Sequence, residues 1–202
     1  MKWFNNIVLE TENVRLIPLK EDHADALTEA AADGELWNLW YTSVPDAENM
    51  HSYIAKALSN YEQDKGMAFA VVDKKSDRII GTTRYTNAAP EHRRLEIGYT
   101  WYAKKHHKTH VNSECKLLLL QYAFEELGAI AVEFRTNWHN HTSRNAIQRL
   151  GAKQDGILRN HQILSDGTLR DTVVFSIIEN EWGSCKKALI FKTGNIHTFN
   201  KA

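Results

Sequence analysis

Residues 94–128 read RLEIGYTWYAKKHHKTHVNSECKLLLLQYAFEELG, and this stretch decides the fold. Its first nine residues alternate apolar side chains with polar or small ones, which is the period of a β-strand. A cationic loop, residues 104–110, follows the strand. A long apolar helix is then expected to begin at Asn112 or Ser113 and to end at Gly128. A strand, a loop and a helix N-terminus therefore meet at one place.

Such a junction favours the binding of an anion. The first N–H groups of a helix lack intrahelical partners, and the helix dipole is positive at that end. Lys116 adds a cation in the first turn of the helix, where it opposes the dipole. We interpret the junction as a phosphate site for a cofactor, with a solvated basic turn as the alternative. The loop cations are Lys104, Lys105, His106, His107, Lys108 and His110.

Length, charge balance and cysteine count limit which classes of protein this chain can belong to. The chain has 202 residues, enough for one domain with a sizeable core, and 25 basic residues balance 25 acidic ones. This balance gives no field that would attract nucleic acid or a membrane, so neither is expected as a partner. The two cysteines fit neither a disulfide framework nor a metal site, and the loop histidines lack a carboxylate or cysteine at ligand spacing. We expect a soluble, cytoplasmic monomer or homodimer without a metal.

The rest of the chain supplies strands and helices on both sides of this stretch. We expect one domain over residues 1–182 and a weakly structured tail over 183–202. The expected helices are 21–33, 46–64, 112–128 and 143–150. The expected strands are 13–19, 67–73, 78–86, 94–102, 130–136, 153–163 and 172–178.

The strand–helix–strand segment over 94–136 requires a right-handed crossover, so its two strands should be parallel neighbours. The flanking hairpins should be antiparallel. The predicted fold class is therefore α/β (α+β): a mixed, mostly antiparallel twisted sheet with a central parallel β-α-β splay and helices on both faces.

Four segments in this order resemble the GNAT superfamily of acetyl-CoA-dependent N-acetyltransferases. Within it they are most similar to the ribosomal-protein N-terminal acetyltransferase branch, which is RimJ/RimL-like. The resemblance covers roughly residues 10–182. The segments are LEIGYTWY (95–102), NSECKLLLLQYAFEELG (112–128), NHTSRNAIQRLGAKQDG (140–156) and DGTLRDTVVFSI (166–177).

The resemblance implies that acetyl-CoA is the co-substrate. Strand backbone would pair with the pantetheine arm, and the N–H groups of 109–113 would hold the pyrophosphate. The family's phosphate loop usually reads Gln/Arg-x-x-Gly-x-Gly/Ala, and the matching positions here are His107, His110 and Asn112, so both small residues are replaced. The charge of Lys104, Lys105 and Lys108 could compensate. The implied contacts are Trp101, Tyr102, His107, Lys108, Thr109, His110, Val111, Asn112, Ser113, Asn140, Ser143 and Arg144.

The same resemblance assigns roles after the parallel pair. Asn140 matches the position that hydrogen-bonds the pantetheine, with an ordinary loop asparagine as the alternative. Many relatives carry a tyrosine where this chain has Ile147, so Ser143 is the candidate that protonates the leaving thiolate. Ser143 could instead only cap the next helix. Arg144 could reach a phosphate or lie exposed.

The acetyl transfer needs a base for the amine. Glu96 is the candidate because it lies on the central strand beside the splay, where partial burial would raise its pKa. The alternative is an ordinary ion pair with Arg94 or Arg135. An aromatic cluster between the first two helices would line the acceptor cleft or pack in the core. Its members are Trp37, Trp40 and Tyr41.

The sequence thus predicts an enzyme that transfers an acetyl group directly from acetyl-CoA to an amine, such as a protein N-terminus or a small amine. The alternatives are a GNAT-fold coenzyme A or ligand-binding protein that has lost catalysis, and a phosphate-dependent binding module unrelated to coenzyme A.

Overall fold

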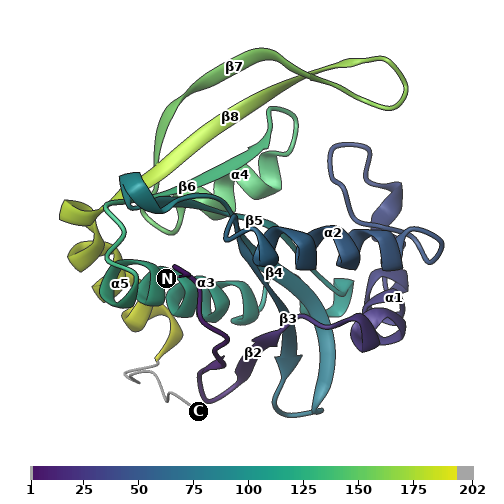
Figure 1. The fold of residues 1–202 in the computed structure, drawn as a ribbon, viewed down its shortest axis with the longest axis horizontal. Helices are drawn as coiled ribbons and strands as arrows, with labels where there is room; N and C mark the ends of the chain where they lie inside the picture. Colours follow the sequence, from purple (N-terminus) through teal and green to yellow (C-terminus); the bar gives the residue numbers. More distant parts are fainter. Residues whose placement is uncertain (1, 195–202) are drawn as a thin grey trace.

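The computed structural model describes residues 2–194 and contains one eight-stranded sheet (Figure 1). The spatial order of its strands is β1-β2-β3-β4-β5-β6-β8-β7. Only β5 and β6 pair in parallel, and every other neighbouring pair is antiparallel. The strands are β1 (Leu9–Glu10), β2 (Val14–Pro18), β3 (Met67–Asp73), β4 (Arg78–Ala89), β5 (Arg94–Tyr102), β6 (Ala131–Asn137), β7 (Lys153–Ile163) and β8 (Leu169–Ile178).

Five α-helices cover the two faces of this sheet (Figure 1). They are α1 (Ala24–Ala32), α2 (Met50–Glu62), α3 (Val111–Gln121), α4 (His141–Gln148) and α5 (Glu179–Thr193). A π-helical turn, Tyr122–Glu126, extends α3. Within residues 2–194, no helix is both long and apolar enough to cross a membrane. The predicted fold class is confirmed, including the single parallel pair.

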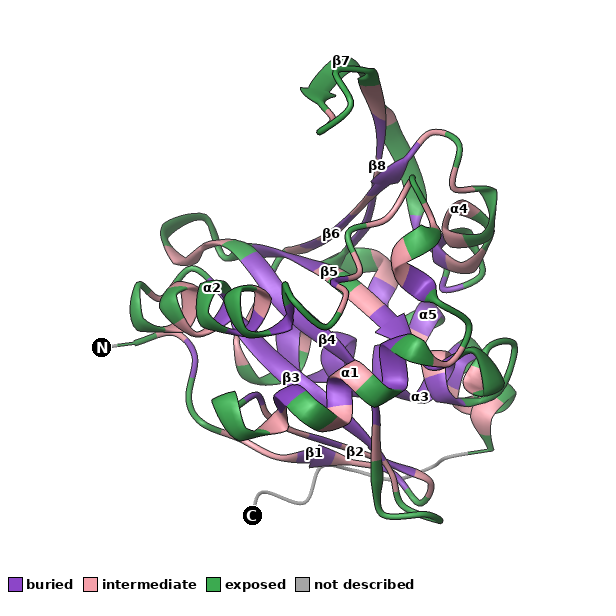
Figure 2. Cartoon of the chain, turned by 90° about the vertical axis from the view of Figure 1, so that its right-hand side faces the viewer, coloured by how far each residue is buried: buried purple, intermediate pink, exposed green. Residues whose placement is uncertain are grey.

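Each face of the sheet has its own apolar core. Along β3, Met67, Phe69 and Val71 point into the larger core with α3 and α5, whereas Ala68 and Ala70 point into the smaller core with α1 and α2. Small alanines on the second face let α1 and α2 approach the sheet closely. Because both faces are covered, residues 67–72 of β3 are all apolar and buried and show no alternation (Figure 2).

The predicted strand and helix positions agree with the structure except at a few boundaries. The short strand β1 was not expected, and α2 begins at Met50 rather than at Asp46. The side chain of Asp46 instead accepts a hydrogen bond from the backbone N–H of Asn49, at 3.0 Å, and holds the turn that precedes α2. Gly128 has a φ of 64°, and this left-handed conformation follows the end of the α3 segment.

The prediction of a weakly structured tail is wrong for the part that the structure describes. Residues from Glu179 to Thr193 form α5, which packs on α3. Trp182, Cys185 and Leu189 are buried at helical spacing. The signal was present in the sequence but was diluted by intervening lysines and a glycine. Residues 195–202 of the predicted tail lie outside the described residues.

Truncating the buried face of α5 tests its role. Leu189 is 1% exposed, so Leu189→Ala should lower the free energy of unfolding by about 2–5 kcal/mol through lost contacts and a cavity. Phe191 lies on the same helix and is 92% exposed, so Phe191→Ala should change it by less than about 0.5 kcal/mol. Urea denaturation measures both, and equal effects would contradict the packing of α5.

Candidate active site

The centre of the site is the point where β5 and β6 separate. Their parallel register contains only three pairs, Arg94 with Ala131, Leu95 with Val132 and Glu96 with Glu133. Both strands continue beyond the third pair, but within the described residues they do not pair with each other there. The backbone of each strand therefore has one unpaired edge in this opening. The predicted splay is present, and Glu96 lies at its apex.

Glu96 is buried, with 6% of its surface exposed. Burial raises the pKa of its carboxyl group above the ordinary value, while a hydrogen bond from Asn87 and the charge of Arg135 oppose the rise. Asn87 Nδ2 donates to Glu96 Oε2 at 2.8 Å, and Arg135 Nε lies 3.5 Å from the same oxygen. These contacts use Oε2 of Glu96. The other oxygen, Oε1, lies beside Gly98. This arrangement suits a group that accepts a proton more readily than an ordinary carboxylate does.

A β-bulge follows the apex on β5. The register of β4 with β5 shifts between Thr82 and Arg84, and Tyr99 opposite the shift has a φ of 51°. A positive φ is costly for tyrosine, so its neighbours must hold it there. Tyr53 Oη on α2 donates to the Tyr99 carbonyl at 3.4 Å. The bulge turns the backbone at the mouth of the splay.

The first turn of α3 lies after β5 and the cationic loop. At this end of the helix, the N–H of Glu114 donates to the carbonyl of His110 at 3.0 Å. Within residues 2–194, the N–H groups of Asn112 and Ser113 have no hydrogen-bond partner, as expected for an uncapped helix start. Val111 and Ser113 are buried, so their side chains are closed to solvent.

Several loop side chains are held by the protein itself. His107 Nε2 lies 2.8 Å from the carbonyl of Tyr102, and Thr109 Oγ1 donates to the carbonyl of His106 at 2.7 Å. The N–H of Lys105 donates to the Asp33 carboxylate at 3.1 Å, which ties the loop to the end of α1. The ammonium groups belong to exposed lysines, Lys104, Lys105 and Lys108.

Trp101 and Tyr102 end β5 with buried side chains. Trp101 Nε1 donates to Tyr53 Oη at 3.3 Å in the smaller core. Tyr102 points to the opposite face, where its Oη donates to Asn112 Oδ1 at 3.4 Å. Burial raises the pKa of Tyr102 well above its ordinary value. These side chains fix the strand, and only its backbone is available to a ligand.

The structure corrects the helix cap after β6. Asn140 is the N-cap of α4, because its Oδ1 accepts from the N–H of Ser143 at 3.0 Å. Ser143 therefore lies in the first turn, not at the cap, and its half-buried hydroxyl is not used in capping. Arg144 stacks on Trp138 with its guanidinium carbon 4.2 Å from the ring centroid, and it donates to the Trp138 carbonyl at 3.1 Å.

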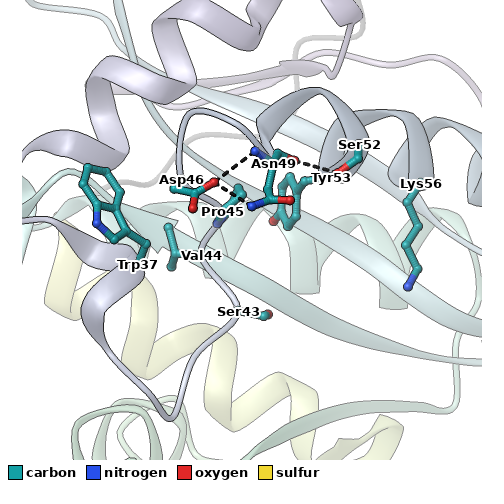
Figure 3. Close-up of a pocket in the computed structure, with 9 residues that line it drawn as sticks. All are labelled: Trp37, Ser43, Val44, Pro45, Asp46, Asn49, Ser52, Tyr53 and Lys56. Carbon is teal, nitrogen blue, oxygen red and sulfur yellow. Dashed lines mark hydrogen bonds between the residues drawn. The ribbon is translucent and has the colours of Figure 1, made fainter. Parts of the chain in front are cut away.

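The residues of the predicted aromatic cluster lie in two different places. Trp37 lines an open pocket of about 440 Å³ with residues from the start of α2, including Asp46, Asn49 and Tyr53 (Figure 3). Trp40 is 60% exposed and lies against Tyr41 and His139, with ring centroids 5.6 and 5.5 Å away. His139 belongs to the β6–α4 connection, so Trp40 spans from the α1–α2 segment to the far side of the splay.

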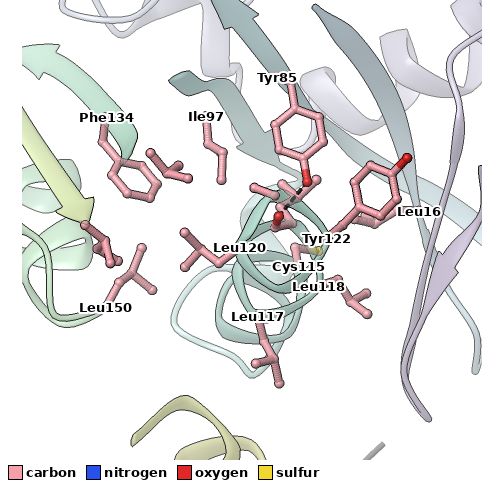
Figure 4. Packing of buried hydrophobic residues seen from close by; sticks show 14 of the residues in the cluster. Leu16, Tyr85, Ile97, Cys115, Leu117, Leu118, Leu120, Tyr122, Phe134 and Leu150 are labelled. Carbon is pink, nitrogen blue, oxygen red and sulfur yellow. Dashed lines mark hydrogen bonds between the residues drawn. The ribbon is translucent and has the colours of Figure 1, made fainter. Parts of the chain in front are cut away.

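Lys116 is the main correction to the predicted phosphate site. Its side chain is 5% exposed and points into the protein, where Nζ donates to Thr100 Oγ1 at 2.6 Å and to Thr83 Oγ1 at 3.4 Å. Burial lowers the pKa of Lys116 to about 8. The neighbouring Cys115 packs among the leucines of α3, and burial raises the pKa of its thiol to about 12 (Figure 4).

Sequence reasoning missed Arg84, on β4 opposite Gly98. It is 3% exposed, and its guanidinium contacts the rings of both Tyr53 and Tyr99. The available signal was an arginine inside the otherwise uncharged strand IIGTTRYT. No feature of the sequence indicated the positive φ of Tyr99.

A family model described as Acetyltransferase (GNAT) domain matches residues 13–153 of this chain. The chain belongs to the GNAT acetyltransferase family. This acetyltransferase is 25% identical over 173 residues to a Bacillus subtilis protein described as uncharacterized N-acetyltransferase YoaA. The match covers 85% of this chain and 97% of that protein. The chain is therefore an enzyme of the acetyltransferase class, as the sequence predicted.

Solved structures share the same architecture. A GCN5-related N-acetyltransferase from Brucella melitensis is 29% identical, with a TM-score of 0.81 over 92% of this acetyltransferase and 85% of that chain. Mycobacterium smegmatis RimJ, in complex with CoA-disulfide, has a TM-score of 0.77 at 18% identity and covers 96% of each chain. At that identity, the likeness to RimJ shows the fold alone.

The buried ammonium of Lys116 predicts a pH-dependent stability. Its pKa is lowered from 10.5 to about 8 on folding, so between these values the unfolded chain binds more protons than the folded one. Stability should therefore rise with pH across this window. Relative to Lys116→Met, the wild-type free energy of unfolding should gain about 2 kcal/mol between pH 8 and pH 10. Parallel curves from urea denaturation would contradict the buried charge.

Proposed function

We propose that this chain transfers an acetyl group directly from acetyl-CoA to an amine, and that a protein N-terminal amine is the first acceptor to test. The observation that carries the proposal is the splay of β5 and β6, with buried Glu96 at its apex and a free helix N-terminus beside it. The finer assignment to the RimJ/RimL-like branch is part of this proposal. So is a cytoplasmic location.

The residues present fit a thioester of coenzyme A. The unpaired N–H groups of Asn112 and Ser113 suit phosphate oxygens, and the exposed loop lysines add positive charge. The free edges of β5 and β6 suit an extended amide chain such as pantetheine, which supplies both donors and acceptors. Acetyl-CoA, when bound, supplies the activated acetyl group.

Two side chains of the protein carry out the two proton transfers of the reaction. Glu96 takes the proton from the amine, directly or through water, since its raised pKa places it nearer neutral pH than an ordinary carboxylate. Ser143 donates a proton to the departing thiolate. The buried thiol of Cys115, with a pKa of about 12, does not provide a thiolate for a covalent intermediate.

The alternative is a protein of this family that binds coenzyme A but has lost catalysis. His110 and Asn112 favour it, because they occupy loop positions where smaller residues would give the phosphates more room.

Acetyl-CoA should raise the melting temperature in a concentration-dependent manner, because a ligand that binds only the folded state stabilises it. Differential scanning fluorimetry measures this shift. Lys108→Ala should reduce it, whereas Lys192→Ala, on the distant helix α5, should leave it unchanged. No shift at millimolar acetyl-CoA would remove the proposal.

Two variants separate catalysis from binding. Glu96→Gln should lower kcat by about 10²–10⁴-fold, and Ser143→Ala should slow turnover less, both with little change in acetyl-CoA affinity. Thiol release during acetylation of a panel of amines and N-terminal peptides measures turnover. In the wild type, the rate should rise with pH as the Glu96 carboxylate forms.

Glu133→Gln is the matched control for Glu96→Gln, since Glu133 is the paired carboxylate on β6. It should change kcat by only a few-fold. Full activity of Glu96→Gln would eliminate Glu96 as the base, and full activity of Ser143→Ala would remove Ser143 from the mechanism. Acetyl-CoA binding without acetylation of any amine would favour the non-catalytic alternative.

A further inference from the structure

Arg84 is a buried cation whose hydrogen-bonding groups are unused. Only 3% of its surface is exposed. Among residues 2–194, its Nε and Nη2 atoms have no hydrogen-bond partner, and the side chain makes no ion pair. Buried polar groups almost always have partners, and an unpaired buried charge is costly. A group that the described chain does not contain is therefore expected at this place.

The guanidinium plane is already fixed. The ring of Tyr53 lies 4.4 Å from its central carbon, and the ring of Tyr99 lies 4.1 Å from it. The two ring centroids are 6.5 Å apart and the rings are inclined at 63°, so the rings meet the cation from two directions and not from opposite faces. Nε and Nη2 share one edge, the side that a carboxylate engages with two parallel N–H···O bonds. Arginine is preferred to lysine for such bidentate contacts.

Arg15 shows what distinguishes Arg84. Arg15 also has a buried Nε without a partner, but its Nη2 donates to Asp77 at 2.9 Å. The charge of Arg15 is therefore compensated within the chain. The charge of Arg84 is not, although both are strand arginines.

The unused edge belongs to the face of the sheet that carries Glu96. Gly98 is the cross-strand partner of Arg84, and Glu96 lies two residues before Gly98 on β5. Two residues of a strand span about 7 Å. Arg135 and Arg170 each have a further buried Nε without a hydrogen bond in the described chain, and the charge of Arg170 acts on Glu96. The charges of two guanidinium groups, Arg135 and Arg170, thus act on the proposed base.

We propose that the acceptor amine carries a carboxylate within a few bonds, and that Arg84 binds this carboxylate through Nε and Nη2. This inference rests on the proposed function, because it places the amine at Glu96. The two nitrogens are closed to solvent in the structure, so binding of the carboxylate requires a side chain that covers Arg84 to move, and Tyr99, which contacts Arg84 and is 46% exposed, is the candidate. The carboxylate belongs to an acidic N-terminal residue or to a free amino acid.

Isothermal titration calorimetry with the full chain tests the carboxylate directly. Two ligand pairs distinguish the sources: the amidated peptides Asp-Ala-Ala and Asn-Ala-Ala, and free alanine with alaninamide. In at least one pair, the acidic member should bind roughly 10- to 100-fold more tightly, which is the range for hydrogen bonds to a charged group. The pair that shows the preference identifies the source.

Variants assign the preference to Arg84. Arg84→Met should abolish it, and Arg84→Lys, which keeps the charge but not the fork, should retain only part of it. Arg15→Met is the matched control and should keep the wild-type preference. Melting temperatures check that each variant is folded. A merely structural Arg84 would lower the melting temperature and weaken both members of a pair equally.

Equal or undetectable binding of both members in both pairs would overturn the inference, as would a preference that survives in Arg84→Met. Acetylation of the two members at equal rates, with equal affinities, would overturn this inference and leave the proposed function intact. A binding preference that depends on Arg84, without any acetyl transfer, would overturn the proposed function and support the carboxylate site.

Discussion

The parallel pairing of β5 with β6 extends over three residue pairs and ends at Glu96 and Glu133. Parallel strands that stop pairing while their backbones continue leave N–H and C=O groups that need other partners. The free edges, the burial of Glu96 and the bulge at Tyr99 all lie at this one place. The rest of the sheet, antiparallel and covered by helices, keeps the two strands apart beyond that point.

Helix α3 connects this opening to the core. Its leucines fill the larger core, and Tyr85 Oη donates to the carbonyl of Leu119 at 2.5 Å. The helix cannot move without disturbing this packing, so its N-terminal N–H groups have a fixed position beside the splay. The same helix carries Lys116 beneath the bulge, bonded to Thr100. One element therefore positions both the unpaired N–H groups proposed to bind phosphate and a buried cation.

The two faces of β4 and β5 differ in chemistry. Tyr85, Leu95 and Ile97 point to α3 and are apolar contacts. The opposite face carries Arg84 and Glu96, two buried charged groups only partly neutralised by the described chain. Burying charge costs free energy, and such costs are concentrated at functional sites. This face therefore differs from the stabilising core and is where recognition of the acceptor is expected.

The sequence by itself determined the element order, the fold class and the importance of residues 94–128, because local periodicity and the crossover rule leave few alternatives. It also identified Glu96 as a central-strand carboxylate. Tertiary structure decided where side chains point. The side chain of Lys116 points inward, Asn140 caps α4 and α5 packs on α3. Arg84 contacts two tyrosines from different elements. These outcomes depend on contacts between residues far apart in the chain, which local patterns do not encode.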